Sequence, residues 1–260
     1  MQKSLPKTCI TIPCYNEANR LPFSELVEDL SRGKWMYLCF VDDGSTDNTL
    51  ELLGVIKKQF PDRVLIIPLA QNRGKAEAVR TGILSSLQTF SPEFVGFFDA
   101  DLATPLAEVE RFLEIADRCT AIKMFSGCRF ARLGAEINRF WWRHYLGRIF
   151  ATAASISLGL PVYDTQCGVK VFRSEEAAYL FREPFLSRWF FDVEIFARMI
   201  RRCGKNQAAK QIMEIPLETW KGRSGSKVKF RTYLLAFVDL LRIHFLYHRD
   251  HKREKDCQSP

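Results

Sequence analysis

The sequence lacks any uninterrupted apolar run as long as the ~18 residues that a membrane-spanning helix needs. Residues 149–160 form too short a run, and residues 233–247 are interrupted by Asp239 and Arg242. The N-terminal segment "MQKSLPKTCITIPCYNE" turns polar before any long apolar stretch, so we expect no secretory signal peptide. The sequence therefore predicts no membrane-spanning segment.

The sequence also lacks cysteines and histidines at the spacings that are typical of zinc sites. The eight cysteines are scattered, with no CxxC pair and no Cys/His cluster of zinc spacing, which argues against a zinc site. Isolated cysteines are typical of small buried side chains in a reducing compartment, so we expect a cytoplasmic protein. The four histidines, at positions 144, 244, 248 and 251, lie outside the polar clusters described below. We expect none of them to be catalytic.

Positive charge is in excess: the formal net charge is +8 and the isoelectric point is near 9.1. Such a charge suits nucleic acid, anionic lipid or phosphorylated small molecules, and does not distinguish among them. Five basic residues and no acid fall in "KGRSGSKVKFR", residues 221–231. Its glycines and serines are typical of phosphate-binding loops, so we expect Arg223, Ser226 and Lys227 to contact pyrophosphate or lipid phosphate. A solvated loop is the alternative.

Short apolar runs alternate with segments of helical periodicity in the first half of the chain. Strands are predicted over residues 8–13, 35–42, 63–70 and 94–100, and helices over residues 45–60, 74–87 and 104–118. The last of these helices is expected to have Thr104 as its N-cap and Pro105 at its first position. This alternation predicts an α/β fold with a mostly parallel sheet and helices on both faces.

The second half has a different composition but no repeat and no low-complexity linker, so we expect a single domain over residues 1–260. A long aromatic and basic helix is predicted first, followed by a loop, a strand, a helix, a further strand and a C-terminal helix. The corresponding residues are 139–160, 163–168, 169–173, about 190–203, 211–220 and about 230–248.

Asp99 and Asp101 follow the apolar run of residues 94–98 and are separated by one alanine. If the strand continued straight, both side chains would point the same way. Two carboxylates that close repel each other unless a cation or a proton shields them. Oxygen ligands of this kind suit Mg²⁺ or Mn²⁺, although a simple turn also contains such residues.

A polar cluster follows each predicted strand of the first half: "PCYNE", "DDGSTD", "QNRGK" and "DAD". In open α/β sheets the ligand lies beyond the carboxyl ends of the strands. Asp43 is well placed there to accept hydrogen bonds from a base or a ribose. Turn formation alone does not require all four clusters at one edge, so their convergence indicates a binding site.

The segments "PCYNE", "VDDGSTDNT", "NRGKAEAVRTG" and "DADLATP", in this order and spacing, resemble the inverting GT-A glycosyltransferases of family 2. "DTQCGVKVF", "RWFFDVEI" and "GSKVK" narrow the resemblance to the dolichyl-phosphate β-glucosyltransferase branch, over residues 8–245. The resemblance implies a GT-A fold with a Rossmann-like central sheet. It also implies transfer of a hexose, with UDP-glucose favoured as donor, to a polyisoprenyl phosphate to give a β-linked lipid-phosphate sugar.

The resemblance also implies roles for individual residues. About residues 1–128 would bind the nucleotide-sugar, and about residues 129–248 would form an acceptor-side half with amphipathic helices. Asp99 and Asp101 would bind Mg²⁺ or Mn²⁺. The donor site would comprise Pro13, Tyr15, Glu17, Asp42, Asp43, Gly74, Lys75, Asp99, Ala100 and Asp101. Mannose-transferring relatives carry a further metal ligand, a glutamine, where this chain has Ala103, so mannose is not assumed as the donor sugar.

A phosphate acceptor shapes the expected chemistry, because it is mostly dianionic at pH 7 and needs cationic positioning instead of a general base. We expect Arg129 to be catalytic through contact with the acceptor phosphate, with a surface salt bridge as the alternative. Asp164 and Gln166 are expected to frame the acceptor pocket, with turn capping as the alternative. Asp192 would be the base for a hydroxyl acceptor. With a phosphate acceptor, Asp192 would instead hold a sugar hydroxyl.

Two segments indicate a lipid surface. Trp141, Trp142 and Tyr145 alternate with basic residues, and residues 230–248 are amphipathic and aromatic, as in interfacial helices. Both could equally be core helices. With a lipid acceptor, we expect peripheral association with the cytoplasmic face of a membrane.

Two other functions remain open. One is a family-2 enzyme that uses a hydroxyl on a glycan, a protein or a small molecule, and the other is a non-catalytic binder of nucleotide-sugar or nucleic acid. We expect no nucleic-acid partner, because the acidic strand ends would repel a phosphate backbone.

Overall fold

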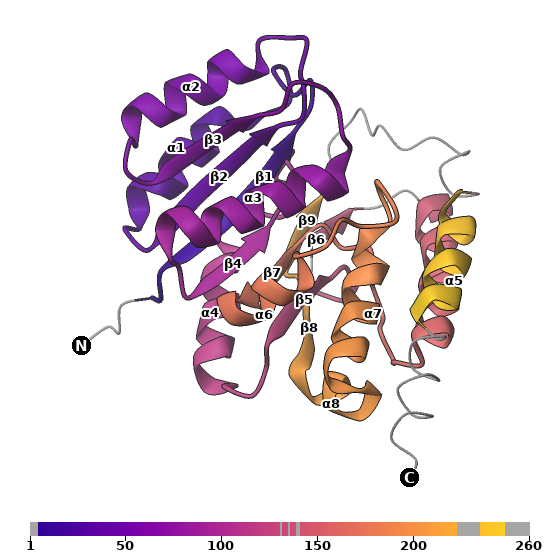
Figure 1. Cartoon of the computed structure of the whole chain (residues 1–260). Helices are drawn as coiled ribbons and strands as arrows, with labels where there is room; N and C mark the ends of the chain where they lie inside the picture. The colour runs from indigo at the N-terminus through magenta and orange to yellow at the C-terminus, as the bar shows by residue number, and fades with distance from the viewer. Residues whose placement is uncertain (1–4, 131, 135, 139–140, 223–234, 248–260) are drawn as a thin grey trace.

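The computed structural model describes residues 5–222 and 235–247 of the chain, except residues 131, 135, 139 and 140 (Figure 1). A large sheet and a two-stranded ribbon contain its strands. The large sheet comprises β1 (Thr8–Cys14), β2 (Met36–Asp42), β3 (Val64–Pro68), β4 (Phe94–Phe97), β5 (Met124–Cys128), β7 (Lys170–Arg173) and β8 (Ile212–Pro216). The ribbon pairs β6 (Glu136–Asn138) with β9 (Thr219–Lys221).

The strand order of the large sheet is β3-β2-β1-β4-β7-β5-β8. β7 runs antiparallel to both of its neighbours, and every other pairing in this sheet is parallel. This confirms the mostly parallel sheet that the sequence predicts. The sheet takes strands from both the donor-side and the acceptor-side halves; the division of the chain into these halves remains a prediction.

Helices cover both faces of the sheet (Figure 1). The helices are α1 (Phe23–Arg32), α2 (Thr49–Gln59), α3 (Lys75–Phe90), α4 (Glu108–Arg118), α5 (Trp141–Leu158), α6 (Ser174–Leu180), α7 (Phe191–Cys203), α8 (Lys205–Gln211) and residues 235–247. One buried cluster contains residues of α1, α2 and α4, and the other contains residues of α3, α5, α6, α7 and the C-terminal helix. Most strand residues are apolar because both faces are covered, and exceptions such as Thr11 and Lys170 are themselves buried.

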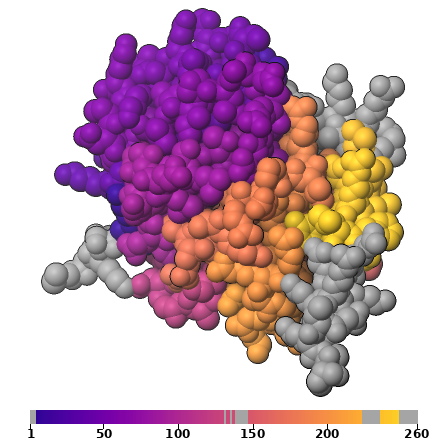
Figure 2. Space-filling model, viewed as in Figure 1, coloured from indigo at the N-terminus to yellow at the C-terminus, as the bar shows by residue number. Residues whose placement is uncertain are grey.

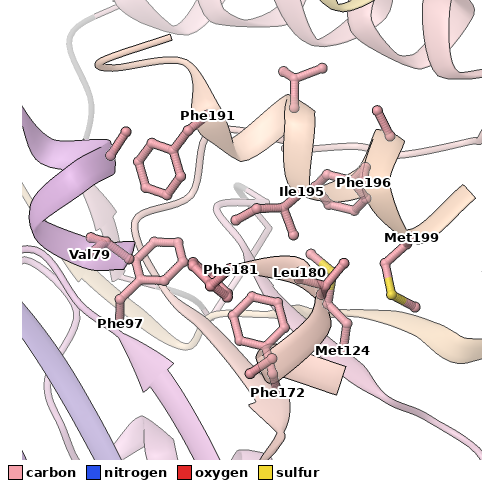
Figure 3. Packing of buried hydrophobic residues seen from close by; sticks show 14 of the residues in the cluster. Val79, Phe97, Met124, Phe172, Leu180, Phe181, Phe191, Ile195, Phe196 and Met199 are labelled. Carbon is pink, nitrogen blue, oxygen red and sulfur yellow. The ribbon is translucent and has the colours of Figure 1, made fainter. Parts of the chain in front are cut away.

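Neighbouring residues of β1 show this double burial: Cys9 belongs to one cluster and Ile10 to the other. Figure 3 shows the cluster on the α7 face, where Phe97 of β4 packs against Phe191 with ring centroids 5.5 Å apart. Phe172 of β7 packs edge-on against Phe181 at 5.3 Å. Complete burial of such a side chain contributes about 1.5–3 kcal/mol.

The predicted start of α4 was wrong. The helix begins at Glu108 with Ala107 as its N-cap, so Thr104 and Pro105 lie in the preceding turns instead of at its first positions. β4 ends at Phe97, and the chain turns at once, with Leu102 at φ 44° and its N–H bonded to the carbonyl of Asp99. Asp99 and Asp101 therefore lie on a turn and not on a straight strand. The predicted strand over residues 211–220 is likewise divided into β8 and β9.

The C-terminal helix over residues 235–247 lies beside α5 (Figure 1) and is exposed at the molecular surface (Figure 2). Ser157 of α5 is hydrogen-bonded to His244, and the Phe150 and Phe237 rings are 5.6 Å apart. Within the described part of the chain, no helix combines the length and apolar character needed to cross a membrane.

Candidate active site

The carboxyl ends of β1 and β2 place two of the predicted polar clusters side by side. Cys14 pairs with Asp42 in register, and the Asp43 N–H donates to the Cys14 carbonyl at 2.8 Å. Beyond the strands, Asn16 Oδ1 accepts the N–H of Thr46 at 2.8 Å. The N–H of Glu17 donates to Thr49 Oγ1 at 2.9 Å. The two turns therefore form one continuous surface at this edge of the sheet.

Asp43 holds the loop that leads into α3. Its two carboxylate oxygens accept the backbone N–H groups of Arg73 and Gly74, at 2.6 and 2.8 Å. Asp43 is buried, and its neighbour Asp42 accepts a hydrogen bond from Ser45 Oγ. The structure thus gives Asp43 a loop-positioning role that the sequence did not indicate, while contact with a base or ribose remains a prediction.

Gly74 sits in the same loop with φ 97°, a backbone conformation that favours glycine. A Cβ at this position would lie 2.8 Å from Nε of Arg188, whose guanidinium bonds the carbonyl oxygens of Asn72 and Arg73. Arg188 therefore fastens the segment before α7 to the loop before α3. Glycine is needed here for both backbone conformation and close packing.

Asp99 is paired with Lys75, the first residue of α3. Lys75 Nζ lies 2.6 Å from Asp99 Oδ1, and it stands 5.9 Å from the centroids of both the Phe97 and Phe191 rings. Burial disfavours the charged ammonium, but Asp99 and then Asp192 outweigh it, so the pKa of Lys75 lies above its ordinary value. Lys75 is therefore a cation at the centre of the site.

Asp101 faces a different basic residue. Its Oδ2 lies 3.3 Å from Nη2 of Arg20, and its Oδ1 accepts the N–H of Ala103 at 3.1 Å. Burial and then the neighbouring Asp99 charge raise the pKa of Asp101 above its usual range. The structure therefore brings the two carboxylates close enough to repel, as the sequence predicts, but each has its own basic partner. Ala100, between them, is buried.

The two aspartates fit Mg²⁺ or Mn²⁺ as oxygen ligands. Among the described residues, no group of three or more His, Cys, Asp or Glu side chains is arranged to hold a metal ion. A cation at Asp99 and Asp101 would thus take its remaining ligands from water or phosphate, which is usual for Mg²⁺.

Arg129 and Asp164, both predicted on the acceptor side, bind each other. Arg129 Nε and Nη2 lie 2.7 and 2.8 Å from the two oxygens of Asp164. Burial acts against the guanidinium charge, but Asp164 outweighs it, so the pKa of Arg129 is raised. Glu214 holds the backbone at this pair, because its carboxylate oxygens accept hydrogen bonds from the N–H groups of Tyr163 and Asp164, at 2.7 and 2.8 Å. A role of this pair in acceptor binding remains a prediction.

The loop after Asp164 reaches Asp99. The backbone N–H of Gln166 donates to Asp164 Oδ1 at 3.2 Å, which is the turn capping weighed above. The side-chain amide nitrogen of Gln166 is buried without a hydrogen-bond partner in the described structure. Gly168 lies against Asp99, because a Cβ there would stand 2.0 Å from Oδ2. A pocket at this contact is lined by Phe98, Asp99, Ala103, Thr104, Gly168, Val169 and Trp220.

Asp192 lies in the first turn of α7 and is ion-paired with Lys170, a residue that the sequence analysis missed. Lys170 Nζ lies 2.5 Å from Asp192 Oδ1, and both side chains are almost completely buried. The same ammonium donates to the carbonyl oxygens of Thr165 and Cys167, at 3.1 and 2.8 Å. The available signal was a single lysine inside the apolar run "VKVF", because a buried lysine requires a partner.

The remaining predicted residues fall in two groups. Pro13 is the one half-buried residue of β1, which ends at Cys14, and Tyr15 and Glu17 lie in the segment that follows. Arg223, Ser226 and Lys227 lie outside the described residues, as do the side chains of Trp141, Trp142 and Tyr145. Their predicted contacts with phosphate and lipid remain predictions.

Comparison with known proteins identifies the family of this chain. Residues 9–178 match the model of glycosyl transferase family 2. A dolichyl-phosphate beta-glucosyltransferase of Saccharomyces cerevisiae is 31% identical, over 94% of this chain and 77% of the relative. The protein of the same name in Mus musculus is 32% identical, over 92% of this chain and 75% of the relative.

A solved structure supports the fold. Glucosyl-3-phosphoglycerate synthase from Mycobacterium tuberculosis, in complex with Mn²⁺, UDP-glucose and phosphoglyceric acid, superposes with a TM-score of 0.65. The two proteins are 17% identical, and the match covers 92% of this chain and 80% of the synthase. Together with the sheet order, this likeness confirms the predicted GT-A fold. The family model covers more than half of the residues of this chain, and 94% of the chain aligns with the Saccharomyces cerevisiae enzyme. The chain therefore belongs to glycosyltransferase family 2.

Proposed function

We propose that this chain transfers glucose from UDP-glucose to a polyisoprenyl phosphate of the dolichyl type, with inversion, to give a β-linked lipid-phosphate sugar. The observation that carries the proposal is the direct contact between Gly168 of the "DTQCG" loop and Asp99 of the "DAD" turn. Both residues line one pocket, and the loop that carries Gly168 begins at Asp164, the ion-pair partner of Arg129. The names of the relatives that align with most of the chain support the same substrates.

The donor side is supported by the strand-end turns. We propose that Pro13, Tyr15, Glu17, Asp42 and Asp43 line the nucleotide, and that Gly74 and Lys75 close over its diphosphate. Asp99 and Asp101 would hold Mg²⁺ or Mn²⁺, and such an ion neutralises the charge that grows on a departing diphosphate. Lys75 adds a buried positive charge next to Asp99.

The acceptor side supplies positioning rather than proton transfer. A phosphate monoester is mostly dianionic at pH 7 and attacks without a base, so its orientation and charge are what the site must control. We propose that the Arg129 guanidinium, oriented by its hydrogen bonds to Asp164, contacts that phosphate. We propose that the buried side-chain amide of Gln166 donates a hydrogen bond to the same phosphate. Arg223, Ser226 and Lys227 would complete the phosphate contacts.

A hydroxyl acceptor is the alternative, and it would need Asp192 as a general base. The Asp192 carboxylate is buried and its Oδ1 lies 2.5 Å from the ammonium of Lys170, so it is already engaged by a buried cation and is not open to a hydroxyl acceptor. This observation favours a phosphate acceptor. Loss of a true general base lowers the rate by about 10²–10⁴-fold. We expect Asp192→Asn to retain far more turnover than that, measured as product per minute at saturating substrates.

The outer face of the C-terminal helix supports peripheral binding to a membrane. Leu235, Val238, Leu241 and Phe245 lie along one exposed stripe, while Ala236, Leu240 and Ile243 on the opposite side are buried. Ile149 and Ile156 of the adjoining α5 are exposed as well. Exposed apolar patches of this kind mark interaction sites. We propose that the patch rests on the cytoplasmic face of a membrane, and co-sedimentation with lipid vesicles tests it.

The function itself is tested by incubating the full chain with Mn²⁺ or Mg²⁺, radiolabelled UDP-glucose and a short polyprenyl phosphate. We expect label to enter the organic phase only when both the metal and the phosphate are present. The matched control is the polyprenol without its phosphate, which should give no lipid product. Exclusively water-soluble products with every nucleotide-sugar offered would contradict the proposal. Thermal shifts with UDP-, GDP- and dTDP-sugars identify the base that the donor site prefers.

A further inference from the structure

Lys75 and Asp99 differ sharply in their access to solvent. The Lys75 side chain is 18% exposed, whereas that of Asp99 is 47% exposed, although their charged atoms are 2.6 Å apart. The ammonium therefore sits on the protein side of the carboxylate, and the carboxylate faces the open edge where the donor is proposed to bind. Such an arrangement occupies one ligand oxygen of the proposed metal site with a cation of the protein itself.

Lys75 does not depend on Asp99 alone for its charge. The Asp192 carboxylate is its second acidic neighbour, and the Phe97 and Phe191 rings, which pack against each other, each have their centroid 5.9 Å from the Lys75 ammonium. Cation–π contacts of this kind stabilise a buried ammonium. An ammonium that leaves Asp99 therefore still has favourable neighbours close by.

Asp101 is likewise paired with a basic residue, Arg20, which comes from another loop. Arg20 Nη2 lies 3.3 Å from Asp101 Oδ2, while its Nη1 lies 3.3 Å from an oxygen of Glu17. Arg20 can therefore release Asp101 and remain paired with Glu17. Both proposed metal ligands are neutralised by basic side chains that have alternative partners nearby.

We propose that Lys75 is an exchangeable counter-ion of the metal site: it holds Asp99 while the site lacks a divalent cation, and it turns to the donor diphosphate when metal and nucleotide bind together. This inference rests on the proposed function. A metal ion on its own competes with the Lys75 ammonium for Asp99. A nucleoside diphosphate offers that ammonium new oxygen partners, so it removes the competition. Metal and nucleotide consequently bind with positive coupling, which is reciprocal between the two ligands.

The test is Mn²⁺ binding by the full chain, followed by the electron paramagnetic resonance signal of free Mn²⁺, with and without UDP. Lys75→Met removes the competing charge, so it should bind Mn²⁺ without UDP about tenfold more tightly than the unaltered protein. The increase in affinity that UDP brings should shrink in the same variant. Lys75→Arg keeps the charge and should keep the Mn²⁺ affinity of the unaltered protein.

Arg73→Met is the matched control, because Arg73 lies two residues before Lys75 and its loss changes the net charge equally. Its side chain is 56% exposed, and its ion pair is with Glu77 at 3.7 Å rather than with a metal-site aspartate. It should alter Mn²⁺ affinity less than twofold. Lys75→Met that binds Mn²⁺ no more tightly than Arg73→Met would overturn the inference.

Circular dichroism of the variants and UDP binding by the unaltered protein distinguish the possible causes of a negative result. If circular dichroism shows that Lys75→Met does not fold, Lys75→Gln removes the same charge and gives the same comparison. If the unaltered protein binds neither Mn²⁺ nor UDP, the proposed function fails, and the inference fails with it. If it binds both and only the Lys75 comparison fails, the donor site stands and the role of Lys75 is wrong.

Discussion

Gly168 and Asp99 are in direct contact and line the same pocket, since a Cβ on Gly168 would lie 2.0 Å from Oδ2 and 2.5 Å from Cγ of Asp99. The contact joins the loop after Asp164 to the turn after β4. Because Asp99 is a flexible side chain whose end can swing away, substitution here should disturb the carboxylate rather than the fold.

Gly168→Ala is therefore expected to fold normally and to bind Mn²⁺ in the presence of UDP about tenfold more weakly, a difference of about 1.4 kcal/mol. The matched control is Gly54→Ala in α2, where an added Cβ meets nothing within 4 Å. It should raise the free energy of unfolding by about 0.5–1 kcal/mol and leave Mn²⁺ binding unchanged. Equal Mn²⁺ affinities in both variants would contradict the assigned contact.

The Arg129–Asp164 pair is expected to matter for stability as well as for the acceptor. Removing one partner of a buried ion pair costs about 3–5 kcal/mol because it leaves the other charge uncompensated. Asp164→Asn should lower the free energy of unfolding, measured by urea denaturation, by an amount near the low end of that range. Glu28→Gln, in the exposed pair with Arg32, should change it by less than about 1 kcal/mol. A small effect of Asp164→Asn would show that the guanidinium has another partner.

Much of the site's location was predictable from the sequence, whereas its pairings were not. Fully apolar strands followed by Asp42, Asp43, Asp99 and Asp101 indicate the sheet edge, since parallel strands end together. The turn at Asp99 was not predictable in the same way, because the positive φ of Leu102 replaces the strand alternation that would align both carboxylates.

Long-range pairing explains most of what the sequence analysis missed. Lys170 and Asp192 meet only because β7 and the first turn of α7 pack together, and nothing local to either residue specifies the partner. Arg129 and Asp164 were both proposed for the acceptor side, but spacing alone did not show that they bind each other. Cores fix such pairs through tertiary packing, which motif spacing does not encode.

The Lys170–Asp192 pair gives a prediction that double substitution tests. Lys170→Met should destabilise the protein by about 3–5 kcal/mol, since it leaves a buried carboxylate alone. Combining it with Asp192→Leu should restore part of that loss, because an apolar pair of similar size is tolerated where a lone charge is not. Urea denaturation of the two single variants and the double variant gives the coupling energy. Strictly additive losses would contradict a direct pair.

Tyr247 of the C-terminal helix gives a prediction at alkaline pH. Burial, and then the Glu194 charge, raise the pKa of Tyr247 to about 12, and its hydroxyl donates to Glu194 Oε1 at 2.9 Å. A raised pKa means that the stabilising contribution is complete below pH 10, the ordinary value, and is lost as the pH rises toward 12.

Tyr247→Phe should therefore lower the free energy of unfolding at pH 7 by about 1.5–3 kcal/mol, the usual contribution of a hydrogen bond to a charged group. The difference between variant and unaltered protein should shrink above pH 10. Urea denaturation at neutral pH and at two alkaline pH values measures the difference in the free energy of unfolding. A difference that is independent of pH would contradict the buried, protonated phenol.

The most direct measurement of the donor site is a crystal structure with Mn²⁺ and UDP-glucose, in which anomalous scattering locates the metal. We predict a peak within coordination distance of both Asp99 and Asp101, about 2.0–2.2 Å from their oxygens, with the diphosphate on the opposite side of the ion. A peak elsewhere, or a bound nucleotide with both carboxylates turned away from it, would contradict the assignment.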